Sequence, residues 1–546
     1  MVKTKLFSFL LVLLFACPSL GQEVDRFIVF FKDKANSQYS VDRPEEFLSD
    51  RAINRRKNQS IEISKQDLPV SAIYLDSLRN NGFEPIFSSR WMNAVLIEAD
   101  PADMVPLVHT SFVKDYKYVA PNHKLNVKTA ETGNLFEPKD PTDIRITSTR
   151  QNEMLGADQM HMEGMTGQGV LIAVFDGGFV KVNRSSVFGH LFREGRILDK
   201  HDFMTNSQNV FAHDDHGTSA LSCIAAKYED SMVGTAYDAS FALYVTEDVR
   251  SEFRIEEYNW LFAAERADSL GADIISSSLG YSEFHDENMN YDYEKDADGK
   301  SSIVSQAAQW ASDRGILVVN SAGNEGINRQ WPHIVFPSDV EDVLAVGAVD
   351  FDGNYTSFSS SGPTADGRIK PDVVALGRNV ATFNDRNSIS PVNGTSFSAP
   401  LISGFAAALW GKYPDLTNKE LKELIIRSCS NLNSPDTLVG YGVPDYIKAT
   451  QQVSLSIQEV FDGYVSVFPN PLTDRRLTVK IDDQLANESI ELLVIAPDGS
   501  DAGKKSIRKH KKGHDHHIHI ESNAKGVYVL KIAVGDRVKF VKLLRY

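Results

Sequence analysis

The chain carries at positions 170–178 the stretch Val170-Leu171-Ile172-Ala173-Val174-Phe175-Asp176-Gly177-Gly178. Six consecutive apolar residues are typical of a strand that is buried on both faces, as in a parallel sheet. Similar short runs recur at Phe241–Val245, Ala272–Ser277, Ile316–Asn320 and Val343–Val349. We therefore predict an α/β fold whose mostly parallel sheet is flanked by helices.

Helical patterns lie between these strands. Amphipathic segments predict helices over Ile255–Leu270 and Ile303–Asp313, closed by Gly271 and Gly315. Thr417-Asn418-Lys419-Glu420 has the spacing of a capping box and predicts a helix that runs to about Arg427. Where strands and helices alternate in this way, we expect the crossovers between parallel strands to be right-handed.

The ends of the chain differ from its centre. With 546 residues, we expect two to four domains. Lys3 and Lys5, the apolar run Leu6–Ala16 and the small residues at 19 and 21 predict a signal peptide over 1–21. Acylation of Cys17 is a less favoured alternative. The net charge of −16 argues against binding of nucleic acid.

Four regions follow the signal peptide. Residues 22–120 alternate strands with helices, predicted through Pro44–Arg56 and Val70–Asn81, and indicate a small α+β domain. Residues 121–147 are polar with two prolines and read as an exposed linker that is easily cut. The sheet domain spans 148–452. Short strands with turn signals predict a β-sandwich over 460–546.

Three residues of the sheet domain together indicate nucleophilic catalysis. Asp176 ends a strand, His216 opens a helix, and Ser396 precedes the apolar helix Leu401–Trp410, with Pro400 expected in its first turn. Each residue alone is more often a structural cap. A serine hydroxyl, however, needs a neighbouring base, and that base needs a carboxylate to orient it. The chain order Asp, His, Ser is that of one class of serine hydrolase.

An asparagine supplies the remaining chemical requirement. Acyl transfer passes through a tetrahedral oxyanion that needs a hydrogen-bond donor fixed in advance. Asn324 follows the strand ending at Asn320 and is flanked by Gly323 and Gly326. We predict that its side chain and the Ser396 backbone N–H form the oxyanion hole.

These segments together resemble the subtilisin, or subtilase, family of serine peptidases. The matching residues are Asp176-Gly177, His216-Gly217-Thr218, Ser321-Ala322-Gly323-Asn324 and Gly394-Thr395-Ser396-Phe397-Ser398-Ala399-Pro400. The resemblance implies a serine endopeptidase and assigns Ser278, Leu279 and Gly280 to the backbone that pairs with an extended substrate. Gly177 and Leu376 depart from the usual residues but remove no catalytic atom. Val335, at the base of the primary pocket, would shorten that pocket.

The flanking regions also carry resemblances. Segments such as Leu48-Ser49-Asp50-Arg51-Ala52 are similar to propeptides of Bacteroidetes subtilases, which implies an intramolecular inhibitor cut within 121–147. Val467-Phe468-Pro469-Asn470-Pro471 and Gly526–Lys531 resemble the C-terminal sorting domain of the type IX secretion system, with a carbohydrate-binding module as the alternative. We therefore expect a zymogen that this machinery delivers to the cell surface or the medium.

Other features remain open. The chemistry requires no cofactor; calcium is possible at the acidic loop around Asp292 and Asp298 but stays unassigned, since such loops are usually solvated. His510, His514, His516, His517 and His519 form either a solvated hairpin or a weak metal site. Cys223 and Cys429 could form a disulfide or two buried thiols. We expect a monomer that acts on proteins or peptides.

Two other functions compete with peptide hydrolysis. A non-catalytic interaction protein built on the same scaffold predicts loss of a catalytic residue, and none is lost. A lipase or esterase predicts Gly-x-Ser-x-Gly around the nucleophile, and Ser396 lacks that pattern.

Overall fold

The computed structural model describes residues 24–121, 147–228, 231–386, 388–452, 465–482, 489–507, 511, 514–522, 524–534 and 537–545. The predicted signal peptide, the linker residues 122–146 and His510 lie outside these ranges. The chain divides into two compact units, one of residues 1–422 and 433–443 and one of 423–432 and 444–546. In the described part of the chain, no helix is long and apolar enough to cross a membrane.

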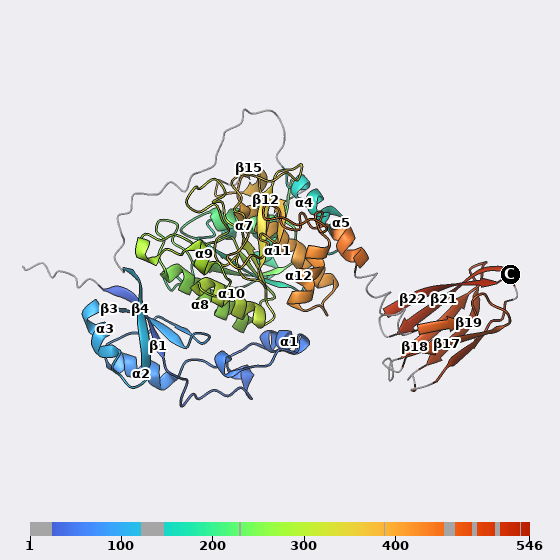
Figure 1. Ribbon diagram of the computed structural model, residues 1–546, viewed down its shortest axis with the longest axis horizontal. Helices are drawn as coiled ribbons and strands as arrows, with labels where there is room; N and C mark the ends of the chain where they lie inside the picture. Colours follow the sequence, from blue (N-terminus) through green and yellow to red (C-terminus); the bar gives the residue numbers. More distant parts are fainter. Residues whose placement is uncertain are drawn as a thin grey trace, which may run out of the picture. The chain divides into compact units, whose positions relative to one another are not determined.

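A sheet flanked by helices forms the centre of the first unit (Figure 1). It has seven strands in the order β13-β12-β11-β10-β5-β9-β6. Every neighbouring pair is parallel, for example Ile274 opposite Ile172 and Asp176 opposite Val245. This confirms the predicted fold class. The strands are β5 (Leu171–Asp176), β6 (Ile197–Asp202), β9 (Ser240–Val245), β10 (Ile274–Ser277), β11 (Leu317–Ser321), β12 (Leu344–Val349) and β13 (Val373–Leu376).

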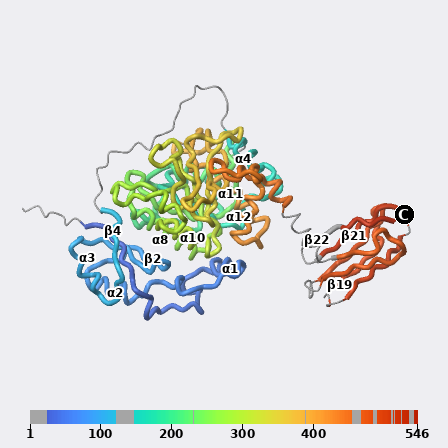
Figure 2. Tube along the Cα trace, in the orientation of Figure 1, coloured from blue at the N-terminus to red at the C-terminus, as the bar shows by residue number. Residues whose placement is uncertain are grey.

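Helices flank this sheet. α7 (His216–Ala225) and α11 (Thr395–Lys412) pack against each other. α8 (Ile255–Leu270) and α10 (Ile303–Asp313) form another pair, which Figure 2 shows side by side, and both have the bounds predicted from their periodicity. Other helices of this region include α4 (Thr149–Leu155), α5 (Ala157–Met162), α6 (Gly189–Arg193), α9 (Tyr293–Asp296) and α12 (Asn418–Arg427).

One helix starts earlier than expected. α11 begins at Thr395, so Pro400 lies in its second turn, and the prediction of a first-turn proline was wrong. A proline at this position cannot donate to the carbonyl four residues earlier. That carbonyl belongs to Ser396, and it accepts a hydrogen bond from the Ser278 hydroxyl (2.8 Å) instead. A long-range contact therefore replaces the missing helical bond.

The N-terminal region forms an antiparallel sheet in the order β2-β3-β1-β4. Its strands are β1 (Asp25–Phe31), β2 (Phe87–Ser89), β3 (Ala94–Ala99) and β4 (Val113–Pro121). Phe27, Val29 and Phe31 face one cluster with α2 (Ala72–Asn80) and α3 (Pro101–Leu107), whereas Ile28 points the other way, into the core shared with α8. Because successive side chains of a strand point to opposite faces, both faces of this sheet are buried.

The helix predicted over Pro44–Arg56 is only partly present. Pro44–Glu46 forms one 3-10 turn, and α1 then runs over Asp50–Asn58. The break occurs because the side chain of Ser49 accepts a hydrogen bond from the Ala52 N–H and caps α1 at its own start.

The tail forms two small antiparallel sheets, β16-β17-β20 and β19-β18-β21-β22. Their inward side chains form one hydrophobic cluster that includes Leu477, Leu492 and Leu530. The strands are β16 (Val465–Phe468), β17 (Arg476–Ile481), β18 (Ile490–Ile495), β19 (Asp501–Ile507), β20 (His516–His519), β21 (Gly526–Val534) and β22 (Arg537–Arg545).

Candidate active site

Asp176 and His216 meet at the carboxyl end of the sheet. Asp176 is the last residue of β5 and is fully buried, and His216 is the first residue of α7. Their side chains are joined by a hydrogen bond between His216 Nδ1 and Asp176 Oδ1 (2.8 Å). A Cβ at Gly217 would lie 2.4 Å from the Gly178 oxygen and 2.8 Å from Asp176 Cβ, so only glycine permits this approach. The His-Gly pair is therefore a steric requirement of the contact.

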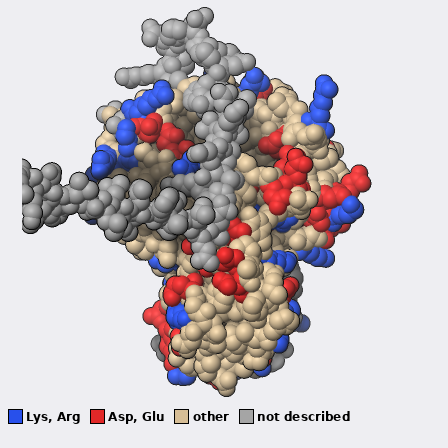
Figure 3. Space-filling view, turned by 90° about the vertical axis from the view of Figure 1, so that its left-hand side faces the viewer, with Lys and Arg blue, Asp and Glu red and all other residues tan. Residues whose placement is uncertain are grey.

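The charges around His216 favour its protonated form. Burial lowers the pKa of His216, but the charge and hydrogen bond of Asp176, together with the charges of Asp214 and Glu247, outweigh that effect and raise the pKa to about 9. Asp214 also accepts a hydrogen bond from the His216 backbone N–H (2.8 Å). Asp and Glu side chains form patches on the face shown in Figure 3, in keeping with the net charge of −16. The imidazole thus lies in a strongly acidic setting.

Ser396 lies in the first turn of α11, close to the residues that follow β10. Its hydroxyl donates to the Ser278 carbonyl (3.5 Å). Within the described ranges no hydrogen bond joins Ser396 to His216, although the His216 ring packs on Phe397, with 5.4 Å between ring centroids. Hydrogen bonds of catalytic groups are often formed only once substrate is bound.

Asn324 is held against the start of α11. Its Oδ1 accepts hydrogen bonds from the Thr395 N–H (2.9 Å) and the Thr395 hydroxyl (3.1 Å). Because a backbone N–H can only donate, these bonds orient the amide with its Nδ2 free to donate elsewhere. Nδ2 lies 3.7 Å from where a Cβ of Gly394 would be, next to Ser396. The amide therefore places Nδ2 near Gly394, two residues before Ser396.

The predicted substrate-pairing segment directly follows β10. Ser278 contacts Ser396 through its hydroxyl, and Leu279 accepts a hydrogen bond from Asn320 Nδ2 (3.0 Å). The Val335 side chain fills the space beside Gly280: its Cγ2 would lie 2.0 Å from a Cβ at that position. It also lies 3.0 Å from a Cβ position at Gly323. Val335 therefore occupies the space between the segment at Gly280 and the segment at Gly323.

The other candidate features have ordinary partners. Asp292 forms an ion pair with Lys295, and Asp298 accepts hydrogen bonds from the N–H groups of Lys300 and Ser301. Cys223 and Cys429 are buried thiols. In β20, His517 and His519 share the exposed face. Across the described residues, no three His, Cys, Asp or Glu side chains are placed to hold a metal ion.

Sequence patterns did not reveal the acidic loop that follows β9. Glu247, which contributes to the raised pKa of His216, lies in this loop. The signal was present as the acidic residues Glu247, Asp248, Glu252, Glu256 and Glu257 within eleven positions. A charge-rich loop is ordinarily solvated, and only the fold shows that this one turns toward the active site.

Three family models match the chain. The Subtilase family matches residues 167–442, the Peptidase S8 propeptide domain of Bacteroidota matches 26–134, and the Secretion system C-terminal sorting domain matches 466–544. The matches follow the predicted order of propeptide, peptidase and sorting tail. They confirm both the subtilase resemblance and the resemblances of the flanking regions.

Individual relatives are more distant. Serine protease AprX of Bacillus subtilis is 29% identical over 48% of this chain and 61% of its own length, and Subtilisin DY of Bacillus licheniformis is 26% identical over 51% and 90%. Subtilisin-like protease SBT6.1 of Arabidopsis thaliana is 26% identical, and the match spans 29% of its length. The crystal structure of MycP1 from Mycobacterium smegmatis matches with a TM-score of 0.45 and 23% identity over 57% of this chain and 86% of that one. Since one family model covers residues 167–442, half of the chain, the protein belongs to the subtilase family.

Proposed function

We propose that the protein is a secreted serine endopeptidase that hydrolyses peptide bonds through Asp176, His216 and Ser396. The observation that carries the proposal is the hydrogen bond between Asp176 and His216 at the carboxyl end of the parallel sheet. Functional groups collect at this edge in open α/β sheets. Ser396 and Asn324 lie at the same edge, at the start of α11 and after β11.

The reaction follows from the roles that these groups are able to play. Ser396 Oγ attacks the scissile carbonyl while His216 Nε2 takes its proton, and Asp176 stabilises the resulting imidazolium. Asn324 Nδ2 and the Ser396 N–H donate to the oxyanion. His216 then protonates the leaving amine, and water, activated by His216, releases the acyl group from Ser396. These steps require no cofactor.

The N-terminal domain fits the role of an intramolecular inhibitor. Ile28 and Leu96 of its sheet, and Trp91 of the turn before β3, share a hydrophobic cluster with residues of α8. The Ser89 hydroxyl and the N–H groups of Arg90 and Trp91 donate to Glu265 of α8. Cleavage within the predicted linker 121–147 would separate this domain from the peptidase domain and convert the zymogen into the active enzyme. The sorting tail would direct the protein through the type IX machinery to the cell surface or the medium.

A fluorophosphonate probe tests the nucleophile directly. The probe reacts with an activated serine hydroxyl, so the processed wild type should be labelled and Ser396→Ala should not. Equal labelling of both proteins, or no labelling of a folded and processed wild type, would reject the assignment. A labelled protein that cleaves an ester but no peptide would instead favour an esterase.

A further inference from the structure

The segment that leads into α7 carries two histidines, and each is bonded to an aspartate that ends a strand. His216 Nδ1 lies 2.8 Å from Asp176 Oδ1, and His213 Nε2 lies 2.8 Å from Asp202 Oδ2. Asp176 ends β5, Asp202 ends β6, and both are fully buried. Because an ionised carboxylate can only accept, the bonded ring nitrogen of each histidine carries a proton. The Asp–His pair of the proposed active site thus has a neighbour of the same kind.

The sheet sets the two aspartates at a fixed spacing. In the parallel register, Asp176 and Asp202 lie opposite the same residue, Val245 of β9, on its two sides. Two strand spacings place the Cα atoms of the aspartates about 10 Å apart. His213 and His216 are three residues apart in the sequence. Three residues of extended chain can cover about 10 Å, so one short segment is able to reach both strand ends.

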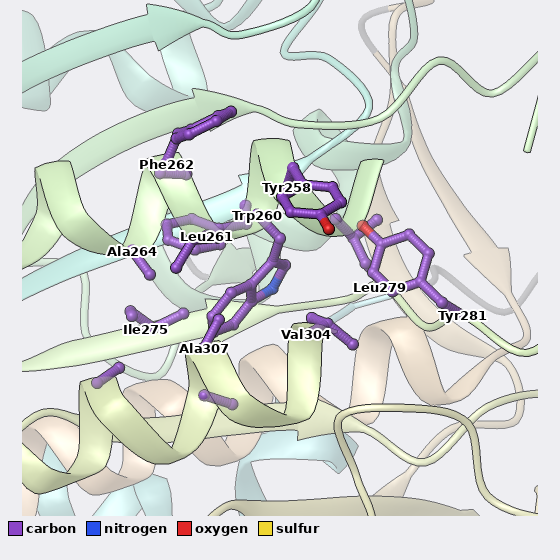
Figure 4. Packing of buried hydrophobic residues seen from close by; sticks show 14 of the residues in the cluster. Tyr258, Trp260, Leu261, Phe262, Ala264, Ile275, Leu279, Tyr281, Val304 and Ala307 are labelled. Carbon is purple, nitrogen blue, oxygen red and sulfur yellow. The ribbon is translucent and has the colours of Figure 1, made fainter. Parts of the chain in front are cut away.

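Aromatic side chains hold the three strand ends together. Phe175 of β5 contacts Tyr244 of β9 with 5.7 Å between ring centroids, and Tyr244 contacts Phe203, the residue after β6, at 5.9 Å. Trp260 of α8 packs edge-on against Phe175 at 5.2 Å. Figure 4 shows this indole among the buried side chains of α8 and Ile275 of β10. All four rings are buried, so the core fixes the positions from which the aspartates project.

Asp202 is an anchor that is held independently of His213. Its Oδ1 accepts hydrogen bonds from the N–H groups of Met204 (2.8 Å) and Thr205 (3.2 Å), and its Oδ2 also accepts the Thr205 hydroxyl. Its backbone forms hydrogen bonds in both directions with Ser207. The Asp202 side chain is inaccessible to solvent, whereas that of His213 is 34% exposed. The bond between them therefore positions the histidine more than the aspartate.

The backbone around His213 is also bonded to the chain that follows β5. The Phe179 N–H donates to the Val210 carbonyl (2.9 Å), and the Val180 N–H donates to the Asp214 carbonyl (3.3 Å). The segment that carries both histidines is thus tied to the end of β6 by a side chain and to the residues after β5 by its backbone.

His213 has a strained backbone conformation. Its φ of +70° lies in the left-handed region, which residues with side chains seldom adopt, although histidine, asparagine and aspartate do so more often than most. Such conformations persist where surrounding contacts hold them, and they are frequent at active sites. The bond to Asp202 supplies such a contact. The next residue, Asp214, accepts the His216 N–H (2.8 Å), so the conformation of His213 bears directly on the first turn of α7.

We propose that Asp202 and His213 form a positioning pair for the catalytic histidine. This inference rests on the proposed endopeptidase function. The pair ties the start of α7 to the end of β6, so the His216 ring stays on Asp176 and its Nε2 is left for proton transfer. Rates depend steeply on such alignment, and a displacement of about 1 Å can cost about a hundredfold. His213 acts through His216 and takes no proton from the substrate or from Ser396.

His213→Asn tests the pair, because asparagine tolerates the left-handed region but is too short to place a donor where His213 Nε2 lies. We expect kcat on one peptide to fall by about tenfold or more, with KM nearly unchanged. Active enzyme is counted by complete reaction with the fluorophosphonate probe, so an unfolded fraction does not enter kcat. The matched control is His161→Asn, which removes the hydrogen bond between a ring nitrogen of α5 and the Thr235 carbonyl and should leave kcat unchanged.

The Asp176→Asn background separates positioning from a structural role. There the imidazole already lacks its orienting carboxylate, so adding His213→Asn should lower the residual kcat only slightly, since residues that act as a unit are not additive. Equal fold losses of kcat in the two backgrounds would overturn the proposal. An unchanged kcat with a lower melting temperature, or a loss confined to KM, would also overturn it. If the folded and processed wild type cleaves no peptide and Ser396 is not labelled, the proposed function itself fails.

Discussion

At the scale of single residues, the proton affinity of His216 gives the most direct prediction. Asp176, Asp214 and Glu247 raise the pKa of His216 to about 9 against the effect of burial. The proposed base acts only when neutral, so kcat/KM should rise with pH and reach half its maximum well above the ordinary histidine value of about 6.5. A pH profile of kcat/KM measures this midpoint.

Asp214→Asn provides the matched control for this profile. The substituted amide oxygen still accepts the His216 backbone N–H, but the charge is gone. The midpoint should therefore move to lower pH while the maximal rate changes little. A wild-type midpoint at or below about 6.5 would contradict the electrostatic account of the site.

Asn324 offers a second prediction at this scale. Asn324→Asp preserves the acceptor for Thr395 but removes the Nδ2 donor, and Asn324→Ala removes both. We expect kcat to fall by about a hundred- to a thousandfold in Asn324→Ala with KM nearly unchanged, the loss typical of an oxyanion donor. The kinetics of both variants on one peptide decide the role, since a loss confined to KM would indicate a binding residue.

Val335 gives a third prediction. It concerns the size of the side chain at P1, the substrate residue that supplies the scissile carbonyl. Its isopropyl group lies against Gly280 and Gly323 and is 6% exposed. The wild type should prefer alanine to phenylalanine at P1, and Val335→Gly should raise the ratio of kcat/KM for phenylalanine over alanine. An unchanged ratio in a variant that still binds the probe would place Val335 outside the pocket.

The site residues that the sequence predicted share a physical property. Asp176, His216, Ser396 and Asn324 all lie at or just beyond the end of a strand or helix, and apolar runs with flanking glycines mark such ends well. The acidic loop after β9 has no such mark. Glu247 comes near Asp176 and His216 only because β9 is the neighbour of β5 in the sheet, which no local pattern encodes.

At the scale of elements, prediction succeeded where local and long-range signals agree. α10 has the predicted bounds because apolar periodicity and a following glycine coincide, whereas α8 is buried on nearly all sides and its end is marked by Gly271. The helix expected over Pro44–Arg56 breaks because the Ser49 cap outweighs the apolar pattern. α11 extends back to Thr395 because Ser278, a residue far away in sequence, satisfies the carbonyl that Pro400 leaves unpaired.

This replacement of a helical bond is testable. Ser278→Ala leaves the Ser396 carbonyl buried without that donor, which should cost about 1–3 kcal/mol. Pro400→Ala restores a backbone N–H at the helical position, so Ser278→Ala should cost less in that background. Melting temperatures of the four proteins, all carrying Ser396→Ala to prevent autolysis, measure the coupling. If Ser278→Ala lowered the melting temperature equally with proline and with alanine at position 400, the Ser278 hydroxyl would not replace the missing helical hydrogen bond.

At the scale of the whole first unit, the propeptide is held by buried charges in addition to apolar packing. Asp268 of α8 forms ion pairs with Arg55, Arg56 and Arg90 of the N-terminal domain. Arg56 also pairs with Asp67, which in turn pairs with Arg314. All of these side chains are nearly inaccessible to solvent. Removal of one partner from such a network costs about 3–5 kcal/mol, because the remaining charges are left unpaired.

These charges also determine how the stability of the complex between the propeptide and the peptidase domain should depend on pH. Although burial alone would raise it, the surrounding arginines hold the pKa of Asp268 well below its ordinary value, and Asp67 shows a smaller shift of the same sign. A lowered pKa in the complex stabilises it above the ordinary aspartate pKa of about 3.9, and this contribution is lost as the pH falls below that value. Burial raises the pKa of Glu265, so this residue instead favours the complex as the pH falls. Neither effect releases the propeptide in mildly acidic solution.

The prediction is that the propeptide stays bound at pH 8 and pH 5 and dissociates only below about pH 4. Size-exclusion chromatography of the Ser396→Ala protein, nicked in the linker by an added protease, measures co-elution at each pH. Asp268→Asn should weaken co-elution at every pH, whereas Arg79→Gln, whose arginine is 46% exposed and pairs with Asp76 and Glu84 inside the N-terminal domain, should have little effect. Release between pH 7 and pH 5 would show that a group with a higher pKa, such as a histidine, controls the complex. Retention in Asp268→Asn equal to that of the parent would show that apolar packing alone holds the domain.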